Sequence, residues 1–175
     1  MNDIESFINK TLKLDLGTMV STQGLQYLSF GIMGTMIEFL GACFDSKGFF
    51  KGGLSRLRFS EAIQKLDAFQ GYRGYDVKNS KHDLYKNMRC GMAHIGRPDK
   101  GVAFAERNDP INGEDHLKVL PIEDGTKRLI LVCEDLYCDL SKAADELLIK
   151  MKSGDKLIKK KHTELFLNLK LKTLK

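Results

Sequence analysis

Four cysteines in 175 residues are too few for a disulfide scaffold, and no two of them are spaced as C-x-x-C. We therefore expect reduced thiols in a cytoplasmic protein. The opening "MNDIESFINK" carries acids at once, and it lacks the basic, apolar and small-residue regions of a secretory leader. G-x-S-x-G and G-x-x-x-x-G-K are also missing. Their absence argues against a serine-hydrolase elbow and a phosphate-binding loop.

A long uninterrupted apolar run is missing too. Residues 25–44 are long enough to span a bilayer, but Gln26, Ser29, Thr35 and Glu38 interrupt them and no basic flank adjoins them. We therefore predict a buried central helix here and no membrane partner.

Charge is unevenly distributed along the chain, whose net charge is +5. Residues 152–175 hold eight lysines against two acids, a net +6, so the rest of the chain sums to −1. This basic C-terminal segment favours a polyanion such as RNA, although a solvated lysine face is the simpler explanation. Its "LFLNLKLK" alternates like a strand, whereas Ile158, Leu165 and Leu169 suit a helix, so both structures stay open.

The composition, 42% hydrophobic and 29% charged, fits one folded domain over residues 1–175. We predict a mainly α (α+β) fold, a bundle of about five helices with a small antiparallel β-meander inserted after the fourth. The expected helices cover residues 2–13, 21 or 22–44, 54–69, 81–94 and 136–151, and the β-rich insert covers about 101–133. Ser21 or Thr22 and Ser55 are the expected N-caps, and "DLGTMVSTQG" is the expected first break.

The central helix carries a stripe of small residues. At about 100° per residue, a sector roughly 100° wide contains Gly24, Gly31, Gly34, Glu38 and Gly41. Each glycine costs about 1 kcal/mol of helix propensity relative to alanine, which suggests a close neighbour on this face. A lone carboxylate there needs a cation, unless the face is solvated. We predict that Glu38 lies within hydrogen-bonding reach of Arg89, in the same chain or a partner.

"LYKNMRCGMAHIGRP", residues 84–98, places Arg89 and His94 on either side of four unreactive residues. Five positions apart, they are rotated about 140° on a straight α-helix and cannot simply touch. They can cooperate if His94 lies in the unwinding last turn of the helix. Alternatively, a second copy packed antiparallel across a two-fold axis would bring each Arg89 to the other chain's His94, and small Gly91 and Ala93 would permit the approach. The seam expected to face the core consists of Leu84, Met88, Gly91 and Ile95.

Arg89-x4-His94, at the end of a late helix in a bundle, resembles the R-x4-6-H motif of HEPN domains (higher eukaryotes and prokaryotes nucleotide-binding). The resemblance follows the helix order over residues 1–150, but only "RCGMAH" matches at the level of a motif. It implies a homodimeric helical bundle and a metal-independent endoribonuclease of toxin–antitoxin or antiviral defence systems. The chain departs from the pattern at Cys90, where such nucleases often carry Asn, Asp or His. The β-rich insert is a second departure.

The chemistry can be stated from the residues. RNA supplies its own nucleophile, the 2′-hydroxyl, so cleavage needs proton transfer and charge stabilisation without metal or cofactor. His94 can exchange a proton near neutral pH, Arg89 can bind two phosphate oxygens, and Glu38 would orient Arg89. The alternative is a non-catalytic HEPN-like module that binds a protein partner or a nucleotide through the same cleft. A purely structural ion pair and helix-end histidine also stay open.

Further candidates are weaker. Stacking and basic side chains give a set of candidate RNA contacts: Tyr72, Arg73, Arg97, Lys159, Lys160 and Lys161. Aromatic residues of this loop more often pack against the bundle, so that alternative stays open for Tyr72. A zinc site built from His82, Cys90, His94 and Cys138 lacks tight ligand spacing. The expected partners are a second copy, RNA, and an antitoxin or other protein.

Overall fold

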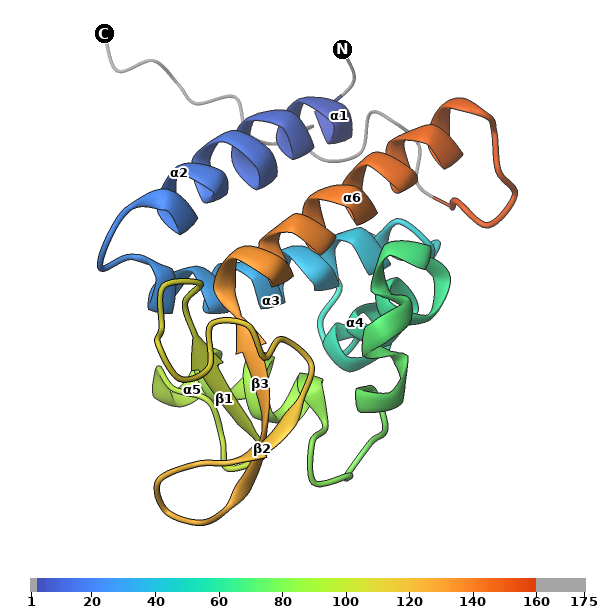
Figure 1. Ribbon diagram of the computed structural model, residues 1–175. Coiled ribbons are helices and arrows are strands. Elements are labelled where there is room, and N and C mark those ends of the chain that lie inside the picture. The colour runs from blue at the N-terminus through green and yellow to red at the C-terminus, as the bar shows by residue number, and fades with distance from the viewer. Residues whose placement is uncertain (1–2, 160–175) are drawn as a thin grey trace, which may run out of the picture.

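The structure is a computed structural model that describes residues 3–159 (Figure 1). Its helical elements are α1 (Asp3–Phe7), π-helical η1 (Ile8–Asp15), α2 (Leu16–Ser21), α3 (Gln26–Ala42), α4 (Ser55–Lys65), 3-10 helix η2 (Asp67–Tyr75), π-helical η3 (Tyr85–Cys90), α5 (Gly91–Ile95) and α6 (Cys133–Lys152). Its strands are β1 (Val102–Ala105), β2 (Val119–Pro121) and β3 (Lys127–Val132). The prediction of a mainly helical protein with a small sheet after residue 100 is confirmed.

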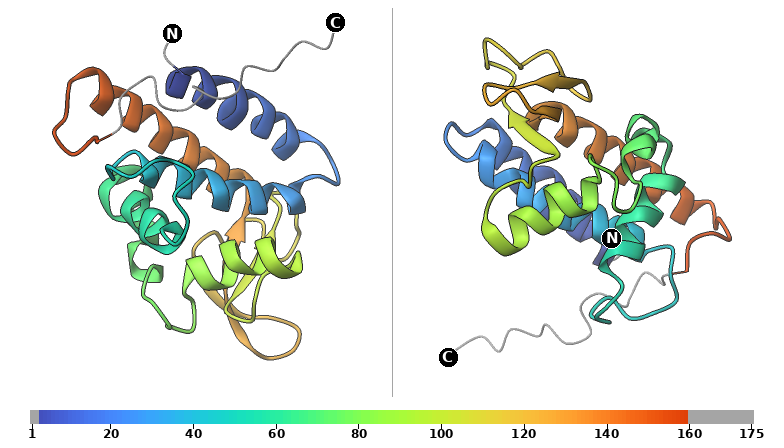
Figure 2. Two further views of the ribbon diagram at one scale, coloured as in Figure 1. Left: turned by 180° about the vertical axis from the view of Figure 1, so that it is seen from behind. Right: turned by 90° about the horizontal axis from the view of Figure 1, so that it is seen from below.

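Helix α6 packs between α3 and the first helices of the chain, while α4 and η2 cover one end and the sheet with α5 covers the other (Figures 1 and 2). The predicted fifth helix is confirmed, although it begins at Cys133. Its whole predicted stripe is buried: Leu140, Ala143, Ala144, Leu147 and Leu148. The central helix is buried as predicted, and no helix within residues 3–159 combines the length and apolarity needed to cross a membrane.

The first helix is longer than predicted, because α1, η1 and α2 run without a break from residue 3 to residue 21. Gly17 does not interrupt it; a Cβ there would lie 2.5 Å from the Tyr137 hydroxyl, which donates to the Lys13 carbonyl (2.7 Å). Ser21 and Thr22 are not the N-caps of α3, since their hydroxyls donate back to carbonyls of the first turn of α2.

Ser55 is not an N-cap either. It is the first residue of α4, which makes no side-chain cap hydrogen bond, and α4 ends at Lys65 before η2 begins. The predicted third helix is therefore divided into an α-helix and a 3-10 helix.

The sheet is mixed, which corrects the predicted antiparallel meander. Strand β3 is central, and β1 pairs with it in parallel (Val102↔Leu129) while β2 pairs antiparallel (Val119↔Leu129). The β2–β3 hairpin agrees with the predicted turn, in which Gly125 has φ +74°. The connection from β1 to β2 is too long for a tight hairpin, so β1 can occupy the other edge of β3. Four consecutive buried residues end β3, as expected of a strand covered on both faces.

Candidate functional site

The predicted contact between Glu38 and Arg89 is present within one chain. The guanidinium donates to a single carboxylate oxygen, with Nε–Oε2 at 2.9 Å and Nη2–Oε2 at 2.7 Å. Both side chains are mostly buried, with exposed fractions of 19% for Arg89 and 17% for Glu38. Burial strengthens the attraction and makes an unpaired partner costly. The pair therefore fixes the position of the guanidinium.

The glycine stripe of α3 explains how Arg89 comes so close. A Cβ at Gly34 would lie 3.2 Å from Cγ of Arg89 and 3.4 Å from its Cα, and one at Gly31 would lie 3.5 Å from Cβ of Met92. A Cβ at Gly41 would overlap the carbonyl oxygen of Arg58. The close neighbours predicted for these three glycines are confirmed. Gly24 is an exception, because it precedes α3, has φ +86° and faces open space.

Tyr85 belongs to this site, and the sequence reasoning missed it. Its ring centroid lies 5.9 Å from Cζ of Arg89 and 5.3 Å from Cζ of Arg56, within cation–π range. Burial, followed by a hydrogen bond with Cys90, raises the pKa of the Tyr85 hydroxyl. The Cys90 thiol is therefore a neighbour of the Tyr85 hydroxyl in this structure. The four-residue spacing from Tyr85 to Arg89 is the signal that could have revealed the contact.

His94 lies in the last turn of α5 and is exposed, without a hydrogen bond among the described residues. Gly96 ends this helix with φ +67°, as predicted. The predicted α-helix over residues 81–94 is wrong in its first part. The chain becomes helical only after Asp83, whose carboxylate accepts the Lys86 N–H (3.2 Å), and its first turns are π-helical. A wider π-helical turn often marks a functional segment.

The set of residues predicted to face the core from this helix is buried except for the last one. Leu84, Met88 and Gly91 are buried, but Ile95 is 59% exposed. A Cβ at Gly91 would lie 2.5 Å from the Arg97 carbonyl oxygen, so the chain's own following segment covers this glycine. Gly91 therefore cannot offer its surface to a second helix. The exposed residues of α5 are Ala93, His94 and Ile95.

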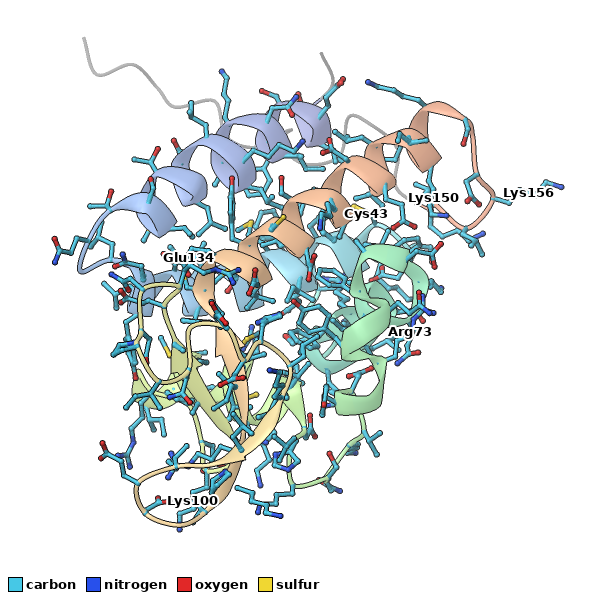
Figure 3. All side chains as sticks on the ribbon, viewed as in Figure 1. Cys43, Arg73, Lys100, Glu134, Lys150 and Lys156 are labelled. Atoms are coloured by element: carbon cyan, nitrogen blue, oxygen red, sulfur yellow. The ribbon has the colours of Figure 1, made fainter. Side chains whose placement is uncertain are left out.

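The other candidate RNA contacts are scattered. Arg73 pairs with Asp67 (3.1 Å) on η2, away from α5 (Figure 3). Arg97 and Lys159 are exposed. Lys160 and Lys161, like most of the basic segment, lie outside the described residues. Within residues 3–159, Arg89 pairs with Glu38 and makes no hydrogen bond or ion pair with any of the other candidates.

The prediction that Tyr72 contacts RNA is wrong. Tyr72 is only 1% exposed, so its ring cannot stack on a base. The backbone N–H of Val132 donates to Nδ1 of His116 (2.9 Å), so the neutral ring carries its proton on Nε2. That N–H donates to the Tyr72 hydroxyl (2.7 Å), which donates to Asp139 (3.0 Å). Burial and then Asp139 raise the pKa of Tyr72 far above its ordinary value, so the phenol keeps its proton.

This network predicts a loss of stability in mild acid. Burial lowers the pKa of His116; Asp135 and Asp139 oppose this effect, while Arg107 adds to it. A proton on Nδ1 would face the Val132 N–H, so the folded state binds fewer protons than the unfolded state. The stabilisation is complete above about pH 6.5 and is lost as pH falls below it, by at most about 1.4 kcal/mol per pH unit.

Urea titrations from pH 7.5 to 5.5 measure this slope. His116→Asn keeps an acceptor for Val132 but does not titrate, so it should flatten the slope. Exposed His94→Asn should leave it unchanged. Equal slopes for wild type and His116→Asn would contradict the assignment.

Within residues 3–159, no three His, Cys, Asp or Glu side chains gather in a group that could hold a metal ion. Nδ1 of His82 instead makes a hydrogen bond with the Gly101 carbonyl (2.8 Å). Burial, followed by Glu134 and Glu106, raises the pKa of the Cys133 thiol to about 12.

Comparisons of the chain with protein-family models, with curated proteins and with solved structures give no match.

Proposed function

We propose that the chain is a metal-independent endoribonuclease in which Arg89 binds the scissile phosphate and His94 transfers protons. The observation that carries the proposal is the fixed guanidinium of Arg89. Glu38 engages Nε and Nη2, and Nη1 makes no hydrogen bond with the described residues. An arginine held in this way can bind a phosphate oxygen without reorganising first.

His94 supplies the other half of the chemistry. Its imidazole can take the proton of the 2′-hydroxyl or donate one to the leaving 5′-oxygen. The guanidinium would stabilise the negative charge that develops on the phosphorane oxygens. Arg89 is mostly buried beside α3, whereas His94 is exposed at the end of α5. We therefore place the complete site between two copies of the chain, each supplying one group to the other.

A non-catalytic module that binds a nucleotide or a protein partner is the second candidate function. It is favoured by the pairing of Arg89 with Glu38, which already compensates the buried charge. It is also favoured by Cys90, which is engaged with Tyr85 where nucleases with the R-x4-6-H motif often carry a polar group. In this case the same surface would bind a nucleotide or a protein partner without catalysing a reaction.

Cleavage of single-stranded RNA in excess EDTA tests the first candidate. We expect wild type to cleave, His94→Ala to lose about 10²–10⁴-fold in rate, and Arg89→Ala about 10²–10³-fold. Arg128→Ala, which removes an arginine paired with Asp124 in the β2–β3 hairpin, is the matched control and should retain activity. Sedimentation must show that each variant keeps the oligomeric state of wild type. Equal cleavage by all variants, or none by wild type, would favour the non-catalytic module.

A further inference from the structure

A second concave site lies between the first turn of α3 and the loop that follows β1. The cavity has a volume of about 480 Å³, within the range of ligand pockets in proteins. Its lining includes Tyr27, Phe30, Phe104, Glu106, Asp109 and Ile111. No residue of η3 or α5 lines the cavity, so it is separate from the Arg89 site.

Aromatic rings build one wall of the cavity. Phe30 and Phe104 are stacked, with centroids 3.8 Å apart and planes 5° apart, so each ring supports the other. The Tyr27 ring meets Phe104 edge-on, with centroids 5.7 Å apart. Tyr27 is 42% exposed and Ile111 is 74% exposed, so the rim offers apolar surface to a ligand. Such rings attract flat or cationic groups.

The charge of the cavity is entirely negative. The Glu106 carboxylate makes no hydrogen bond with the described residues. Oδ1 of Asp109 accepts hydrogen bonds from the backbone N–H groups of Ile111 and Asn112, which leaves its Oδ2 available. The neighbouring Arg107 is directed away, since its guanidinium pairs with Asp135 on α6. With two carboxylates and no cation in its lining, the cavity would repel a phosphate and attract a positive group.

We propose that this cavity binds an arginine side chain presented by a basic segment of a partner protein. A guanidinium is flat and always charged; it can lie against an aromatic ring while it donates hydrogen bonds to carboxylates. Lysine offers a point charge without a flat face, so it fits this lining less well. The cavity volume leaves room for residues that flank the arginine, and Ile111 and Tyr27 would contact them. This binding does not depend on the ribonuclease proposal.

Peptide titrations of the full chain, followed by amide chemical shifts in NMR spectra, test the proposal. The probe is acetyl-Gly-Arg-Gly-amide. Its matched analogue carries citrulline, which keeps the flat shape but lacks the charge. We expect saturable shifts at Tyr27, Phe104 and Glu106 with the arginine peptide, and binding at least about ten-fold weaker with citrulline. Glu106→Gln should weaken arginine binding by a similar factor. Glu114→Gln, in the same loop but outside the cavity lining, should not change it.

Three results would overturn the proposal. The first is the absence of saturable shifts with the arginine peptide. The second is equal affinity for the citrulline peptide, which would remove the role of charge. The third is tighter binding of adenosine or cytidine, which would assign the cavity to a nucleobase. Folding of each variant is verified by its dispersed spectrum before titration.

Discussion

Replacement of Gly41 by alanine is expected to reduce the free energy of unfolding by about 3 kcal/mol or more. The added Cβ would overlap the carbonyl oxygen of Arg58 and approach the Ala62 backbone nitrogen to 3.1 Å. Both obstacles are backbone atoms of α4, so no side-chain rotation can relieve the clash and the two helices must separate. Separation would also disturb Arg58, which is 3% exposed and donates to Asp45 and to backbone carbonyls.

Gly31→Ala is the matched control in the same helix. Its Cβ would meet Met92 at 3.5 Å, an ordinary van der Waals contact. Because alanine favours the helix by about 1 kcal/mol over glycine, this variant should be as stable as wild type or more stable. Urea denaturation followed by circular dichroism measures both variants. A Gly41→Ala protein with the midpoint of wild type would show that α3 and α4 do not pack as closely as described.

The second large effect is expected at the Glu38–Arg89 pair. Glu38→Ala should cost about 2 kcal/mol of folding free energy, because it leaves a mostly buried guanidinium without its partner. This value lies below that for a fully buried pair, since both side chains retain some exposure. Arg89→Ala leaves the carboxylate unpaired and should also destabilise the fold. The double variant removes both charges, so its loss should be smaller than the sum of the two single losses.

A double-mutant cycle measured by urea denaturation gives the coupling energy, for which we expect about 1–3 kcal/mol. The control is the pair of Lys118 and Asp115, in which the lysine side chain is 59% exposed, so its coupling should be much weaker than that of Glu38 and Arg89. Additive losses at Glu38 and Arg89 would mean that the pair does not fix the guanidinium. Should the chain cleave RNA, Glu38→Gln, which keeps an oxygen acceptor, should preserve more activity than Glu38→Ala.

The Glu38–Arg89 contact was predictable because two local features required a partner. Gly31 and Gly34 lower helix propensity without a turn to explain them, and Glu38 is the lone charge in a long apolar helix. Each feature lowers the stability of the fold unless another element packs on this face of the helix. Arg89 lies beside small residues that allow such a close approach. The contact between Tyr85 and Arg89 was not predicted, because an aromatic residue four positions from an arginine is also common where the two side chains do not interact.

The other differences between the predicted and the observed structure arise from tertiary packing, which the sequence does not show directly. The parallel pairing of β1 with β3 joins residues far apart in sequence, and turn residues such as Gly125 define only the hairpin between β2 and β3. Gly91 seemed free for a second copy because the sequence does not show that residues 97–99 fold back over it. Gly17 seemed a helix break because the Tyr137 side chain that packs on it comes from a distant helix.

The position of β3 at the centre of the sheet has a consequence for folding during protein synthesis. Helices α3 and α4 and the Arg89–Glu38 pair use residues that leave the ribosome before β3 does. Strand β1 emerges soon after them, but its partner, residues 129–132, follows only after β2 and the hairpin. Until then β1 presents an unpaired apolar edge to the solvent, the kind of surface that invites association with other chains. We therefore expect translation through residues 106–132 to be an interval in which β1 of the nascent chain is exposed to association.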